Sequence, residues 1–80
     1  MELNKIIKEV EPIEVLNFKD VDILGISYNS NTINSHEIFV CLKGEHADGH
    51  DYAQMAFEKG AVALMCEKPL NIEIPQLIVK

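Results

Sequence analysis

The stretch that decides the fold of this chain is Glu37–Tyr52, with the sequence EIFVCLKGEHADGHDY. Five successive apolar residues, Ile38 to Leu42, are typical of a strand that is buried on both faces. A strand with one solvent-exposed face would instead show alternating apolar and polar residues. A polar loop bracketed by Gly44 and Gly49 follows, and then a helix begins. Ligands of open α/β sheets bind beyond the carboxyl ends of the strands. We therefore expect the functional site at this loop.

Length and composition indicate one small folded domain. A chain of 80 residues buries roughly 60% of its unfolded surface, so its core is thin. The apolar fraction of 48% and the charged fraction of 25% are ordinary for a globular protein. A net charge of −6 without a basic run argues against nucleic-acid binding. The sequence has no bilayer-spanning apolar run and no secretion-signal pattern, so we expect no membrane partner and a cytoplasmic location.

Four further segments have strand patterns. They are residues 14–19, 23–28, 61–66 and 76–79. In the first of these, Leu16 and Phe18 would face the same side. The third is a continuous apolar run, so we expect it to lie parallel to the strand that begins near Ile38. Cys41 and Cys66 fall inside the buried strands, which predicts reduced core thiols and no disulfide.

Two helices complete the pattern. Apolar residues recur at helical spacing from Leu3 to Val10, which predicts a short amphipathic helix there. For the second helix, Asp51 is predicted to be the cap, with Gln54 in capping-box spacing, and Gly60 to close the last turn. The expected fold class is α/β, with a small, mixed, mainly parallel sheet, flanking helices and a single domain over residues 1–80.

Reactive side chains in this sequence do not form a recognisable catalytic or metal motif. His46, Asp48 and His50 are of metal-binding types, but the usual zinc spacings are absent and side chains in such loops commonly bond to the backbone, so we predict no metal site. We likewise reject nucleophilic catalysis by Ser30 or Cys41, since a thiol inside an apolar strand is inert. No phosphate-binding or dinucleotide-binding glycine motif is present, so we expect no cofactor and no catalytic residue in this chain.

The polar segment Asn29–Ser35 has two interpretations. Its side chains commonly bond to the local backbone, which predicts an ordered loop. It would also form part of a binding site if the strand ending at Tyr28 and the strand preceding His46 are neighbours. A planar base or small cofactor in that crevice would stack on an aromatic ring, while Ser30 and loop amides bond to its polar edge. From the residues alone, both interpretations remain open.

Several short motifs, spread through the chain in the right order, resemble the N-terminal domain of the Mur ligases. They are Tyr28–Asn31, Ile38–Gly44, Asp48–Tyr52, Ala56, and Gly60–Ala63 with Glu67. Within that family the sequence is most similar to the members that add the third amino acid to the peptidoglycan precursor.

The resemblance implies that the chain holds the uridine diphosphate (UDP) end of UDP-N-acetylmuramoyl-L-alanyl-D-glutamate. By matching position, Tyr28 and Ser30 would contact the uridine nucleotide, and Glu45, His46 and Ala47 would line the same site. The family also has a central domain that uses ATP and Mg²⁺ and a C-terminal domain, both absent from this sequence. The complete enzyme would be an ATP-dependent amide-forming ligase of bacterial cell-wall synthesis, and this chain alone is not expected to be catalytic.

The match has departures, and other functions remain open. The family pattern is Asp-Ser-Arg where this chain has Asn29, Ser30 and Asn31, so one cation near the diphosphate is missing. A charge-assisted hydrogen bond of that kind contributes on the order of 1.5–3 kcal/mol. One alternative function is the sister ligase that adds D-alanyl-D-alanine. Another, from a different class, is a non-catalytic interaction module that shares the fold.

Overall fold

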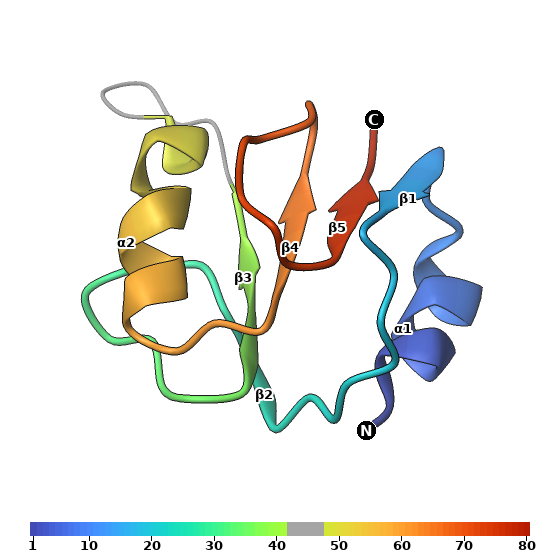
Figure 1. The fold of residues 1–80 in the computed structure, drawn as a ribbon, viewed down its shortest axis with the longest axis horizontal. Coiled ribbons are helices and arrows are strands. Elements are labelled where there is room, and N and C mark those ends of the chain that lie inside the picture. The colour runs from blue at the N-terminus through green and yellow to red at the C-terminus, as the bar shows by residue number, and fades with distance from the viewer. Residues whose placement is uncertain (42–47) are drawn as a thin grey trace.

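The computed structural model of this protein describes residues 1–41 and 48–80, and Figure 1 shows their arrangement. In chain order the elements are α1 (Leu3–Val10), β1 (Glu14–Leu16), β2 (Gly25–Ser27), β3 (Glu37–Val40), the 3-10 helix η1 (Gly49–Tyr52), α2 (Ala53–Glu58), β4 (Ala63–Cys66) and β5 (Gln76–Ile78). Within the described residues, the longest helix has 8 residues and none has the length and apolar character needed to cross a bilayer.

One mixed sheet organises the chain. Its strand order is β1-β5-β4-β3-β2. β2, β3, β4 and β5 are parallel to their neighbours, and only β1 is antiparallel, on the outer edge of β5. β3 lies between β2 and β4, with Ile38 opposite Ala63 and Val40 opposite Met65. The prediction of a small, mixed, mainly parallel sheet with flanking helices is confirmed, and so is the parallel pairing of the two central apolar strands.

Alternate residues of the central strands supply two cores, one on each face of the sheet. Phe39 and Leu64, 1% and 0% exposed, pack on the α2 side, whereas Ile38 and Leu77, each 0% exposed, pack on the α1 side. In Figure 1 the two helices accordingly lie on opposite sides of the sheet. Burying one such side chain contributes about 1.5–3 kcal/mol, which explains why these strands have no polar face. The two cysteines are buried and free, as predicted.

Both outer strands are shorter than their patterns predict. β1 ends at Leu16 because the next residue, Asn17, has a left-handed backbone with φ of 54°. The prediction that Phe18 continues this strand beside Leu16 is therefore wrong, and Phe18 is 54% exposed. β2 covers only Gly25–Ser27 of the predicted segment 23–28. As an edge strand, it pairs on one side only.

The beginning of the second helix also differs from the prediction. The cap residue is Asp48 and not Asp51, since the Asp48 side chain accepts a hydrogen bond from the His50 backbone N–H at 3.0 Å. The chain first forms η1 and continues into α2 without a side-chain cap at Tyr52. The predicted end is correct: Gly60 follows the last turn with φ of 117°.

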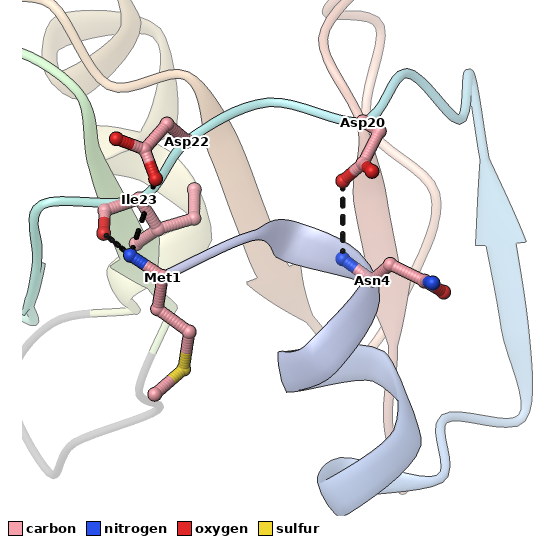
Figure 2. A network of polar contacts seen from close by, with 5 residues as sticks. All are labelled: Met1, Asn4, Asp20, Asp22 and Ile23. Atoms are coloured by element: carbon pink, nitrogen blue, oxygen red, sulfur yellow. Dashed lines mark hydrogen bonds and ion pairs between the residues drawn. The ribbon is translucent and has the colours of Figure 1, made fainter.

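The first helix is held from outside its own sequence, as Figure 2 shows. Glu2 precedes α1 but makes no side-chain cap bond. Instead, the Asp20 carboxylate accepts a hydrogen bond from the Asn4 N–H at 3.3 Å. The Met1 amino group donates to the Asp22 carboxylate at 3.2 Å and to the Ile23 carbonyl at 2.9 Å. Residues 20–23 therefore fasten α1 to the sheet.

A buried glutamine orders the connection between β4 and β5. The Gln76 side chain is 0% exposed. Its oxygen accepts from the Leu70 N–H at 2.8 Å, and its amide nitrogen donates to the Leu70 carbonyl at 2.8 Å and the Ile72 carbonyl at 2.7 Å. The amide thus replaces the hydrogen bonds that this loop would otherwise make with water.

Candidate functional site

A cavity of about 270 Å³ lies where β2 and β3 end and η1 begins. It is lined by Tyr28, Asn29, Ser30, Asn31, Phe39, Gly49 and Tyr52. Its volume is close to the lower limit of known small-molecule sites, about 300 Å³. The cavity therefore suits one planar ring system and its immediate substituents.

The wall that follows β2 is a closed turn. The Ser27 hydroxyl accepts a hydrogen bond from the Asn29 N–H at 3.2 Å, and the Asn29 side-chain oxygen accepts from the Asn31 N–H at 2.9 Å. Ser30, which lies inside the turn, is 7% exposed, whereas Tyr28 is 72% exposed. The predicted side-chain-to-backbone bonds and the predicted site residues therefore occur in the same segment. The turn fixes the backbone from which Tyr28 and Ser30 reach the cavity.

The opposite wall is η1, which is fastened through a histidine. His50 is 8% exposed. Its Nδ1 atom lies 2.5 Å from the Asp48 carboxylate, and its Nε2 atom accepts a hydrogen bond from the Glu67 N–H at 2.9 Å. The two hydrogen bonds from the His50 backbone and ring lower the pKa of Asp48. Gly49 and Tyr52, which lie on either side of this anchor, line the cavity.

The structure brings some predicted site residues together and leaves others undescribed. Tyr28 and Ser30 line one cavity, and the strand before them is a neighbour of β3, which the site interpretation required. Glu45, His46 and Ala47 lie outside the described residues. The sequence interpretation missed the roles of Phe39 and Tyr52 as cavity walls. Phe39 lies next to the last residue of β3 and Tyr52 ends η1, and these positions beside the predicted loop could have indicated them.

The other chemical alternatives lack support among the described residues. In residues 1–41 and 48–80, no group of three metal-ligating side chains comes together. Both ring nitrogens of His50 already have partners. Burial raises the pKa of the Cys41 thiol to about 12, assisted by nearby Cys66 and Asp48. A thiol that keeps its proton is a poor nucleophile, which agrees with the predicted core role.

A larger hollow, of about 440 Å³, lies at the opposite end of the sheet. Residues before β4 and β5, among them Val62 and Ile74, line it together with Phe57. Its lining is mainly apolar, and it lies at the amino ends of these parallel strands. Ligands of open α/β sheets bind beyond the carboxyl ends. We therefore assign the candidate site to the smaller cavity.

Comparison with known proteins gives consistent matches. A family model described as "Mur ligase family, catalytic domain" matches residues 22–80. The chain is 40% identical over 82 aligned positions to the UDP-N-acetylmuramoyl-L-alanyl-D-glutamate–2,6-diaminopimelate ligase of Bacillus velezensis, a match that covers 100% of this chain and 16% of that protein.

Solved structures show the same fold. The crystal structure of MurF from Acinetobacter baumannii is similar with a TM-score of 0.85 and 24% identity, over 95% of this chain and 17% of that one. The MurF ligase of Thermotoga maritima, in complex with ADP, is similar with a TM-score of 0.61 and 32% identity, over 69% of this chain and 13% of that one. The chain thus spans less than a fifth of the length of each of these relatives.

Proposed function

Because this chain belongs to the Mur ligase family, whose model matches residues 22–80, we propose that it binds the UDP end of a UDP-N-acetylmuramoyl peptide. The observation that carries the proposal is the cavity shared by the Tyr28–Asn31 turn and η1. This cavity lies at the carboxyl ends of two neighbouring parallel strands, where such sheets bind ligands.

The cavity lining suits a nucleoside base. The exposed Tyr28 ring can stack on uracil, with the partly exposed Tyr52 ring supplying further aromatic surface. Ser30 and the two asparagines offer hydrogen-bond donors and acceptors for the polar edge of the base or for the ribose. Among the described lining residues there is no Lys or Arg. In this proposal the base and ribose are therefore recognised here, and the diphosphate points out of the cavity.

We further propose that the substrate is UDP-N-acetylmuramoyl-L-alanyl-D-glutamate and that the complete enzyme adds the third peptide residue. The 40% identity to a 2,6-diaminopimelate ligase supports this choice. The chain would then be an N-terminal substrate-binding domain of a cytoplasmic ligase. It has no phosphate-binding loop motif, so ATP and Mg²⁺ belong to a central domain outside this sequence. Holding the nucleotide end orients the distant carboxylate, an effect that can supply several kcal/mol of a barrier.

A second candidate function is the N-terminal domain of the ligase that adds D-alanyl-D-alanine. The 32% identity to the Thermotoga maritima MurF ligase favours it. The two candidates share the UDP site, so UDP binding does not separate them. Calorimetry that compares the dipeptide-bearing with the tripeptide-bearing UDP substrate does so, provided that the complete protein is used.

A titration followed by amide signals tests the shared proposal. UDP should shift the amide signals of Tyr28, Ser30, Gly49 and Tyr52, all of which are in or beside the cavity. ADP serves as the matched control, because it carries the same diphosphate on a larger base. Shifts confined to Val62 and Ile74, at the opposite hollow, would contradict the proposal. Absence of any uridine-nucleotide binding would favour a non-catalytic interaction module.

A further inference from the structure

We propose that His50 is the positioning residue of the uridine site, holding the η1 wall of the cavity against the end of β4. The inference rests on the proposed function only for the identity of the ligand. His50 does not itself line the cavity, but its neighbours Gly49 and Tyr52 do. It acts through them, and it needs no contact with the nucleotide.

The hydrogen-bond partners of the ring indicate which nitrogen donates and which accepts. A backbone N–H can only donate, so the Nε2 atom of His50 accepts from Glu67 with a lone pair. The proton of the neutral imidazole therefore resides on Nδ1, where it is donated to the Asp48 carboxylate. The His50 ring is thus held by a carboxylate on one side and a backbone amide on the other, with Nδ1 as the donor and Nε2 as the acceptor.

This ring connects two segments that end at the same edge of the sheet. Asp48 caps η1, and Glu67 directly follows β4. In the part of the chain that the structure describes, the bond from Glu67 to His50 is the hydrogen bond that joins η1 to a strand end. Without it the Glu67 N–H loses its partner, and apolar contacts such as those of Ala53 in the following helix are left to hold the η1 wall against the sheet.

Two substitutions test the two hydrogen bonds of the His50 ring separately. In His50→Gln the side-chain oxygen can take the place of Nε2 and accept from Glu67. In His50→Asn the shorter amide can take the place of Nδ1 and donate to Asp48, but it cannot reach Glu67. Each variant therefore keeps one of the two hydrogen bonds. The Asp48 cap on the His50 backbone N–H remains available in both.

The test is UDP binding to the 80-residue chain by calorimetry, with thermal unfolding of each variant measured in parallel. His50→Asn should bind about tenfold more weakly than the wild type, because the η1 wall has lost its polar anchor. His50→Gln should stay within about threefold of it. Equal binding by both variants, whether strong or weak, overturns the proposal, as does weaker binding by His50→Gln than by His50→Asn. Val62→Ala, which removes core volume far from the cavity, checks that lower stability alone does not weaken binding.

A second readout needs neither ligand nor variant. The ring nitrogens of His50 should show Nδ1 protonated and Nε2 unprotonated in a long-range proton–nitrogen spectrum of the wild type. A proton on Nε2 overturns the assignment.

If the wild type does not bind UDP, the proposed ligand is wrong, but the positioning role is still decided by the Gly49 and Tyr52 amide signals. These should shift in His50→Asn and stay near their wild-type positions in His50→Gln.

Discussion

The side-chain oxygen of Asn29 accepts a hydrogen bond from the Asn31 backbone N–H at 2.9 Å, which closes the turn that forms one wall of the cavity. The Asn29 side chain is therefore used for structure, while the side chain of Asn31 is exposed and lines the cavity. This division of roles indicates which position can be changed to add a contact without opening the turn.

Asn31→Arg should strengthen binding of UDP. The new guanidinium would supply the cation that the family pattern has at this place, and a charge-assisted hydrogen bond to phosphate at an exposed site should raise the affinity about tenfold. Uridine, which has no phosphate, should bind as it does to the wild type. Calorimetry with both ligands measures the difference. Asn31→Gln is the uncharged control, and an equal gain for uridine and UDP would refute the electrostatic explanation.

Tyr28→Ala should weaken UDP binding and leave stability almost unchanged. Base stacking on an aromatic ring contributes about 1–3 kcal/mol, whereas the ring is 72% exposed in the unliganded chain. Tyr28→Phe keeps the stacking surface and should bind nearly as the wild type does. Phe18→Ala removes another exposed aromatic ring, which does not line the cavity, and serves as the control. Unchanged affinity in Tyr28→Ala would exclude stacking at this residue.

Gly60→Ala should destabilise the fold by about 1–3 kcal/mol. Gly60 has φ of 117°, and a Cβ atom there would lie 2.9 Å from the Ser35 backbone Cα. Gly25→Ala is the matched comparison, because the three atoms nearest to its Cβ would all belong to the Glu37 side chain, whose carboxylate oxygen would be 2.6 Å away. A flexible side chain can move, so this variant should lose less. Urea unfolding of both variants measures the difference, and an equal loss would contradict the backbone argument.

The Cys41 thiol should resist alkylation in the folded chain. Burial raises its pKa from 9.0 to about 12, so almost no thiolate exists near neutral pH. Mass spectrometry after iodoacetamide treatment at about pH 8, with and without denaturant, measures this, since the unfolded thiol has an ordinary pKa. Rapid labelling without denaturant would show an exposed thiol.

The same pKa shift predicts a loss of stability in alkali. The folded state holds the Cys41 proton more tightly than the unfolded state does. The unfolded state therefore loses its proton first as the pH rises, which favours unfolding. This contribution to stability is present in full below pH 9.0 and is lost as the pH rises towards about 12. Cys41→Ala should show less of this alkaline loss in thermal unfolding measured across that range.

The sequence predicted the parts of the fold that depend on local pattern. The apolar run after Glu37 predicted β3, and the run before Cys66 predicted its parallel neighbour β4. Because these strands are buried on both faces, their composition alone distinguishes them from edge strands. The strand that ends before Tyr28 is indeed a neighbour of β3, which was the condition set for a crevice shared with the loop after β3.

Features that depend on contacts between distant residues could not be predicted in the same way. Asp48 and Asp51 are both suitable caps, and only the η1 turn, fixed through Glu67, selects Asp48. The Glu67 amide is 17 residues from His50 in the chain. No local pattern contains such a pairing. Likewise Phe18, apolar and in strand spacing with Leu16, is exposed because the left-handed backbone of Asn17 turns the chain away.

The buried amide of Gln76 has a consequence for the uniqueness of the fold. Its three short bonds to Leu70 and Ile72 can form only when the loop before β5 lies in one alignment. An apolar residue of similar size would fill the same space while accepting neighbouring alignments, because apolar packing has no direction. An apolar substitute would also leave the Leu70 N–H and the carbonyls of Leu70 and Ile72 without these partners, so Gln76 both stabilises this loop and restricts it to one alignment on β5.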